Sequence, residues 1–324
     1  MNKNLKFTFI DLFAGIGGMR IPFSELGGKC VFTSEIDVKA AATYAENFGE
    51  NPAGDICFIQ EDDVPPHDLL LAGFPCQPFS NAGLKKGFTD ATRGTMFFEI
   101  ERMVSHHRPS ALLLENVKGL VSHDKGKTMR VIEQRLDDLG YWVHKKVLNA
   151  RDFGLPQNRE RIYIVCLRKD LFGPKDFSFP EPTNFPTRLG RILERRVDPK
   201  FTISDKLWEG HQRRRREHAA KGNGFGYSLF TRDSAYTSTI SARYYKDGSE
   251  ILISQGPDSQ GRKRNPRKLT PREAARLQGF PDTFILNPSN VQAYKQFGNA
   301  VAVAVVRAIA EKLVPLIAGV HRKK

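Results

Sequence analysis

The stretch Leu69-Leu-Leu-Ala-Gly-Phe-Pro-Cys-Gln-Pro-Phe-Ser80 joins an apolar run to a stiff loop. The four apolar residues predict a buried strand, and Gly73, Pro75 and Pro78 end it because none of them continues a strand. Cys76 therefore falls at the carboxyl edge of a sheet, where ligands bind in open α/β sheets. A free cysteine is often only a small buried hydrophobe, so this stretch alone leaves a structural and a reactive thiol open.

Length and composition indicate a folded protein. The chain has 324 residues, 40% of them hydrophobic and 27% charged, which suggests two domains or one large domain with an insertion. No uninterrupted apolar run reaches the roughly 20 residues needed to span a bilayer, so we expect a cytoplasmic protein without a membrane partner. The cysteines are too far apart for a metal site or a disulfide framework. Three of them lie in apolar, strand-like surroundings: Cys30, Cys57 and Cys166.

The positive charge is concentrated in one region. Residues 188–276 hold 21 Lys and Arg against 10 Asp and Glu, which is most of the net charge of +14. Such a surface favours nucleic acid, because binding to phosphates releases counterions. The alternative is a solvated basic face without a partner.

The first third of the chain predicts a nucleotide-type pocket. A strand over residues 5–13 runs into Ala14-Gly-Ile-Gly-Gly18, whose glycines allow a tight turn before a helix. The Gly-x-Gly-Gly spacing departs from Gly-x-Gly-x-x-Gly and suits a dinucleotide pyrophosphate less well. Glu35 ends the next strand, about 20 residues past the glycines. A carboxylate in this position suits hydrogen bonding to ribose hydroxyls. Asp55 follows the same pattern, although either carboxylate alone is more often a surface group.

Further alternation of strands and helices predicts an α/β fold with a doubly wound, mostly parallel sheet. Glu115 ends the strand at residues 111–115, where a helix cap or an ion pair is the common alternative to a catalytic role. Arg159 and Arg161, in Gln157-Asn-Arg-Glu-Arg161, could hold a phosphate or a base carbonyl. Residues 81–95 read as a mobile basic loop.

The alternation of predicted strands and helices ends after residue 185, where prolines and arginines become frequent. We expect residues 186–286 to form a smaller, irregular, β-rich domain, with a β-rich run at residues 236–253. A last Ala/Val-rich helix, ending near residue 316, should return to the sheet. The predicted division is therefore 1–185 plus 287–324 for the cofactor-binding and catalytic domain, and 186–286 for target recognition.

With these residues in hand, the chain resembles the bacterial DNA (cytosine-5)-methyltransferases of restriction-modification systems. The resemblance covers nearly the whole length and rests on six motifs in the family's order. They are Asp11 to Gly18, Gly73 to Ser80, Glu115-Asn-Val117, Gln157 to Arg161, Arg267 to Pro281, and Gln292 to Val301.

The resemblance implies a Rossmann-like fold that binds S-adenosylmethionine. Glu35 would hold the ribose hydroxyls, and Asp55 and Ile56 would contact the adenine. Ile36 stands where family members often carry an aromatic residue, so packing there would be aliphatic. The remaining implied cofactor contacts are Phe13, Gly15, Ile16, Gly17, Gly18, Pro75, Asn299 and Val301.

The resemblance also implies covalent catalysis without a metal. The Cys76 thiolate would add to carbon 6 of cytosine, which makes carbon 5 nucleophilic. Glu115 would hydrogen-bond or protonate ring nitrogen N3, and Arg161, helped by Arg159, would hold the base carbonyl and adjacent phosphate. The cytosine must leave the helix stack to reach these groups.

The implied partner is double-stranded DNA, read in the major groove by residues 186–286. The run 237–253 is similar to relatives acting on CC-N-GG-like or CCGG-like sites. A tRNA cytosine methyltransferase and a non-catalytic DNA-binding relic are the alternatives. We expect a monomer, with a cognate restriction endonuclease encoded separately. The implied DNA contacts are Gln77, Ser80, Arg93, Tyr227, Thr239 and Arg243.

Overall fold

The computed structural model describes residues 7–75, 96–183, 185–224, 226–258 and 260–321. Two compact units divide the chain. The first comprises Met1–Asn149, Glu160–Glu181 and Val305–Lys324, and the second comprises Ala150–Arg159 and Pro182–Ala304. The division differs from the predicted one in that residues 150–159, 182–185 and 287–304 group with the second unit. The roles assigned to the two parts stay a prediction.

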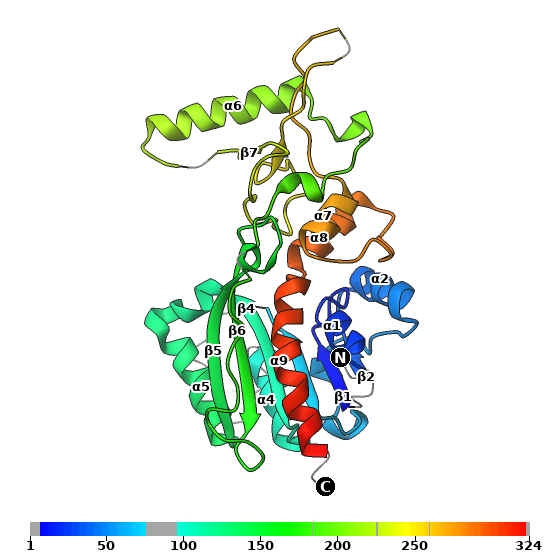
Figure 1. The fold of residues 1–324 in the computed structure, drawn as a ribbon, viewed down its shortest axis with the longest axis vertical. Helices are drawn as coiled ribbons and strands as arrows, with labels where there is room; N and C mark the ends of the chain where they lie inside the picture. Colours follow the sequence, from blue (N-terminus) through cyan, green and yellow to red (C-terminus); the bar gives the residue numbers. More distant parts are fainter. Residues whose placement is uncertain (1–6, 76–95, 184, 225, 259, 322–324) are drawn as a thin grey trace. The chain divides into compact units, whose positions relative to one another are not determined.

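A six-stranded mixed sheet forms the centre of the first unit (Figure 1), in the order β2-β1-β3-β4-β6-β5. The strands β2, β1, β3 and β4 run parallel to one another, whereas β6 is antiparallel to both β4 and β5. The predicted α/β class and mostly parallel pairing are thereby confirmed. The strands are β1 (Phe7–Leu12), β2 (Gly28–Ser34), β3 (Leu69–Gly73), β4 (Ala111–Val117), β5 (Tyr141–Asn149) and β6 (Glu160–Arg168).

Helices cover both faces of this sheet, which explains the continuous apolar runs of its inner strands. Alternate strand residues such as Leu70 and Leu112 share a core with Ile100 of α4 (Met96–His107) and Ile132 of α5 (Lys127–Asp138). On the opposite face, α9 (Val303–His321) crosses in front of the strands in Figure 1. The shorter helices are α1 (Arg20–Glu25) and α2 (Val38–Phe48). Among the described residues, no helix combines the length and apolarity needed to cross a membrane.

The strand register aligns the carboxyl ends of the parallel strands. Leu12 of β1 lies between Ser34 of β2 and Ala72 of β3, and Gly73 pairs with Glu115 of β4. Residues that follow these strands therefore meet at one edge of the sheet. That edge is the expected place for a ligand site in a sheet of this kind.

The second unit is not β-rich, so that expectation was wrong. Its described strands are the two-residue pair β7 (Leu229–Phe230) and β8 (Leu252–Ile253). The arginine-rich stretch instead forms α6 (Asp205–Ala220), because Arg, Lys, Glu and Gln are good helix formers and the Ser204 side chain caps its first turn. The predicted β-run before β8 folds into turns. Two further helices are α7 (Pro271–Leu277) and α8 (Asn290–Asn299).

Candidate active site

The glycine turn after β1 is shaped by backbone conformation and by packing. Gly15 and Gly17 have φ values of +57° and +82°, which side chains rarely adopt. A Cβ at Gly17 would lie 2.2 Å from a ring carbon of Phe48, so the turn also packs too closely against α2 for any larger residue. Phe13 at the strand end also has a positive φ of 55°. The prediction of a tight turn here is confirmed.

Glu35 closes this turn from the neighbouring strand. One carboxylate oxygen accepts a hydrogen bond from the Gly15 N–H at 2.7 Å, and the other accepts one from the Asp37 N–H at 2.7 Å. Partial burial raises the pKa of the Glu35 carboxyl, and these backbone donors oppose that rise. Each oxygen keeps a lone pair for a further donor such as a ribose hydroxyl.

The residues predicted to contact adenine differ in exposure. Asp55 accepts a hydrogen bond from the Cys57 N–H at 3.0 Å, while the Ile56 side chain is only 2% exposed in the sheet core. Ile36 is 66% exposed and so available for aliphatic packing. Phe58, which no sequence motif singles out, is 74% exposed two residues after Ile56. The exposure of Phe58 could not be predicted, because a single aromatic residue in a loop-like stretch carries no periodic pattern.

A buried carboxyl group stands behind the turn. Asp11 of β1 is 1% exposed, and its Oδ2 has no hydrogen-bond partner among the described residues. Burial raises the pKa of Asp11 to about 8; Arg20 opposes this rise and Glu35 adds to it. Burial therefore favours the protonated, uncharged form of the Asp11 side chain beneath the turn.

The start of the cysteine-bearing loop is tied to β4. The Asn116 side chain is 2% exposed and donates a hydrogen bond from Nδ2 to the Phe74 carbonyl at 2.9 Å. Pro75 follows and is exposed. Asn116 belongs to a motif recognised in the sequence, but its role as a positioning residue could not be read from it. Cys76 itself lies outside the described residues.

Glu115 and Arg161 form an ion pair at the same edge. The Glu115 Oε1 lies 3.3 Å from the Arg161 Nε, and the two side chains are 11% and 16% exposed. The antiparallel register of β4 and β6 causes this meeting, since Val117 is opposite Arg161. A Cβ at Gly73 would lie 3.9 Å from Glu115 Oε2. The site therefore places a carboxylate and a guanidinium beside the strand that leads to Cys76.

Arg159, by contrast, is bound up within the second unit. Its guanidinium is buried and donates to the backbone carbonyls of Ile240 at 3.1 Å, Gly298 at 3.2 Å and Ala300 at 2.8 Å. Gln157 is fully buried beside it and accepts a hydrogen bond from the Ile240 N–H at 3.0 Å. These contacts give Arg159 a positioning function in holding three segments together.

The segment before α9 is packed closely within the second unit. A Cβ at Gly298 would lie 2.3 Å from the Ala242 backbone nitrogen, so only glycine allows this approach of two backbones. Asn299 is exposed and Val301 is 7% exposed. Their predicted contact with the cofactor stays a prediction.

The predicted DNA contacts fall into two groups. Tyr227, Thr239 and Arg243 lie in the second unit, and the Thr239 hydroxyl donates to the Asn158 carbonyl at 2.6 Å. Arg243 is exposed, and Tyr227 is half-buried. The other three, Gln77, Ser80 and Arg93, lie outside the described residues. The whole of the loop predicted to be mobile, residues 81–95, lies outside them too.

Comparisons with known proteins agree with this arrangement. The chain is 58% identical to the type II methyltransferase M1.ScrFI of Lactococcus lactis subsp. cremoris over 97% of its own length and 80% of the relative. It is 57% identical to M.NlaX of Neisseria lactamica over 98% and 99% of the two chains. Among solved structures, DNMT2 of Spodoptera frugiperda, in a mutant form, matches with a TM-score of 0.74 at 23% identity. That match covers 95% of this chain and 99% of the other, and it supports the methyltransferase fold.

The family model described as C-5 cytosine-specific DNA methylase matches residues 7–315. This range includes the glycine turn, Glu35, the strand before Cys76 and the Glu115–Arg161 pair. The family match and the site geometry together identify the chain as a member of the C-5 cytosine-specific DNA methylases, whose similar relatives here are type II methyltransferases.

Proposed function

We propose that this DNA cytosine methylase transfers a methyl group from S-adenosylmethionine to carbon 5 of a flipped-out cytosine, through a covalent bond to Cys76. The observation that carries the proposal is the Glu115–Arg161 pair at the carboxyl edge of the sheet. A carboxylate and a guanidinium at this point match the N3 nitrogen and the carbonyl of a cytosine ring.

The turn and strand ends fit the proposed cofactor. Gly15 and Gly17 leave the backbone of the turn without side chains, Glu35 offers lone pairs to the ribose, and Ile36 offers an exposed apolar surface to the adenine. Phe13, Ile16, Gly18 and the segment with Asp55 and Ile56 would complete the pocket. When bound, S-adenosylmethionine supplies an electrophilic methyl group.

The chain's own residues would then act on the cytosine. The Cys76 thiolate adds to carbon 6, and Glu115 hydrogen-bonds or protonates N3 so that the ring does not hold the resulting charge. Arg161 holds the base carbonyl and keeps Glu115 oriented. After methylation of carbon 5, loss of the proton on that carbon expels Cys76 and restores the aromatic ring.

The relatives favour DNA over tRNA as the substrate. The Glu115–Arg161 pair favours a catalytic methylase over a non-catalytic DNA-binding relic. Both close relatives described above are named type II methyltransferases. We further propose that the chain acts as a monomer, that residues 186–286 read the target sequence, and that a separately encoded restriction endonuclease shares the same site.

Methyl transfer tests the function directly. Purified protein with S-adenosylmethionine carrying a labelled methyl group is expected to label mixed-sequence duplex DNA, because both substrates meet at the carboxyl edge. It should leave tRNA unlabelled in the same assay. Bisulfite sequencing of host DNA after expression would then read out the target sequence. Labelling of tRNA alone, or of neither polymer, would contradict the proposal.

The cofactor assignment predicts a specific loss for Glu35→Gln. The amide has one acceptor oxygen for two backbone donors and turns an NH₂ group toward one of them. A hydrogen bond to a charged group contributes about 1.5–3 kcal/mol, so affinity for S-adenosylmethionine should fall by roughly tenfold to a hundredfold. Isothermal titration calorimetry measures this change.

Glu46→Gln is the matched control, since Glu46 lies exposed on α2. It should bind the cofactor as the unchanged chain does. If both variants folded and bound S-adenosylmethionine with equal affinity, Glu35 would not be a cofactor-binding residue.

A further inference from the structure

The helix α6 carries its positive charge in its second half, which includes four consecutive arginines, Arg213 to Arg216. Helical spacing places residues 212, 215, 216 and 219 on one face, because positions three, four and seven apart lie above one another. Arg215 and Arg216 both lie on this face, and Arg216 lies nearly opposite Arg214 around the helix.

An adjoining side of α6 is anchored to the rest of the second unit, and its His211 ring also lies 6.2 Å from the Tyr227 ring. His211 is 2% exposed, and its Nε2 lies 3.3 Å from the Asp247 carbonyl. Arg214 donates to the His211 Nδ1 at 2.9 Å and to the Asp247 carboxylate at 3.2 Å. Burial lowers the pKa of His211, which favours the neutral ring with its proton on Nε2. These contacts fix the rotation of the helix and therefore the direction of the outer face.

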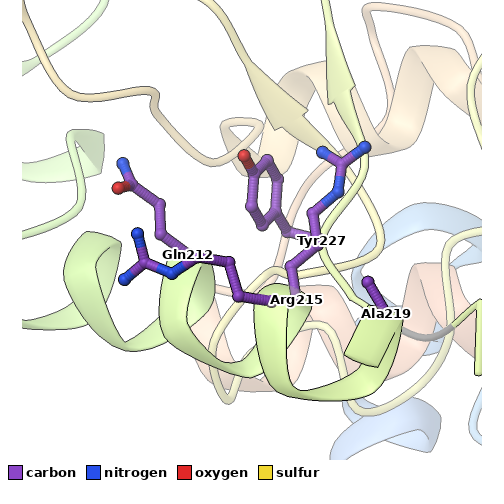
Figure 2. Close-up of a pocket in the computed structure, with 5 residues that line it drawn as sticks. Gln212, Arg215, Ala219 and Tyr227 are labelled. Carbon is purple, nitrogen blue, oxygen red and sulfur yellow. The ribbon is translucent and has the colours of Figure 1, made fainter. Parts of the chain in front are cut away.

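The outer face and Tyr227 line an open hollow of about 360 Å³. Figure 2 shows Gln212, Arg215 and Tyr227 rising on the same side of α6, with the small Ala219 beside them. The Tyr227 ring is held from two sides. The Arg215 Cζ lies 4.8 Å from its centroid, and the Trp208 ring packs edge-on at 4.7 Å.

The charges in this hollow are not neutralised by the protein. Arg213 pairs with Glu217 at 3.7 Å and Arg214 with Asp247 at 3.2 Å. Within the described parts of the chain, neither Arg215 nor Arg216 has a carboxylate within 4.0 Å, and the Tyr227 hydroxyl makes no hydrogen bond. Guanidinium groups only donate hydrogen bonds, so the hollow fits a ligand whose oxygens only accept them. A phosphodiester has that chemistry, whereas base edges present donors as well.

We propose that the α6 face formed by Gln212, Arg215, Arg216, Ala219 and Tyr227 binds a backbone phosphate of the DNA substrate and positions the duplex without reading its sequence. The proposal rests on duplex DNA being the substrate. Its ligand is the sugar-phosphate backbone, because contacts to phosphate carry no sequence information. The fixed rotation of α6 and the packing of the Tyr227 ring hold the donors ready for it.

The double variant Arg215→Gln/Arg216→Gln tests this site. Duplex affinity is measured from low to moderate salt, with the target duplex and with an unrelated duplex of equal length. The slope of log affinity against log salt should become shallower by about 1 to 2, because about one counterion is released per phosphate contact. Affinity at moderate salt should fall roughly tenfold, equally for both duplexes, and kcat at saturating DNA should not change.

Arg213→Gln serves as the matched control, since it removes the same group from the same helix but from an arginine already paired with Glu217. It should leave the slope nearly unchanged. An equal loss in this control would indicate diffuse charge and overturn the site, as would a loss confined to the target duplex. Methyl transfer by the unchanged chain separates failure of this proposal from failure of the proposed function.

Discussion

Replacing Cys76 with serine is expected to abolish methyl transfer to DNA while leaving cofactor binding intact. A free cysteine thiol ionises with a pKa near 8.5, whereas a serine hydroxyl does not ionise at neutral pH and so adds poorly to carbon 6 of cytosine. Removing a nucleophile of this kind costs roughly 10⁴-fold or more in kcat. Steady-state transfer of labelled methyl groups measures the loss, and calorimetry with S-adenosylmethionine measures the binding.

DNA with 5-fluorocytosine at the target position tests whether Cys76 is the nucleophile. Fluorine at carbon 5 cannot leave as a proton does, so the unchanged protein should remain bonded to the DNA on a denaturing gel. The Cys76→Ser protein should bind this DNA without the bond. Cys57→Ser, which changes a thiol elsewhere in the first unit, should still form it. A trapped complex with the Cys76→Ser protein would exclude the mechanism.

A second large effect is expected for Glu115→Gln. The amide keeps the shape of the side chain and an oxygen for Arg161, 3.3 Å away in the unchanged protein. It cannot donate or take up a proton at cytosine N3, and general acid–base catalysis contributes about 10²–10⁴-fold. The value of kcat should fall by that factor, and trapping of 5-fluorocytosine should slow in parallel, because the thiol addition itself is affected.

Glu160→Gln provides the comparison, since Glu160 lies next to Arg161 and pairs with Lys118 at the surface, 3.0 Å away. Surface pairs contribute about 0–1 kcal/mol, so this variant should retain its activity. If Glu115→Gln transferred methyl groups at the normal rate, another group would have to hydrogen-bond or protonate ring nitrogen N3.

The sheet could be predicted because its signals are local. Apolar runs closed by glycine or proline define β3 and its loop, and the glycines after β1 define its turn. The start of α7 is equally local, since Thr270 and Glu273 form a capping box within four residues. Glu115 and Arg161 were each recognised, but their contact depends on the antiparallel pairing of β4 and β6.

The second unit was harder to predict because its structure depends on distant partners. Helix α6 buries only His211 along its length, so it shows little of the apolar periodicity by which a helix is recognised. The alternation before β8 resembled a strand, yet the Tyr244 hydroxyl donates to the Ile251 carbonyl and holds a turn. Arg159 bonds carbonyls 81 to 141 residues away, which no local pattern encodes.

The binding of Arg159 and Gln157 across the second unit has a practical consequence for exchanging sequence specificity between relatives. A graft of residues 186–286 would exchange Ile240, Leu277 and Gln278, all partners of Gln157, while the host kept residues 150–159. A mismatch there would leave buried donors of the chimera without acceptors, which would lower its stability by about 1–3 kcal/mol for each unsatisfied group. A workable cassette should therefore carry residues 150–159 together with 182–304, joined at four points of the chain.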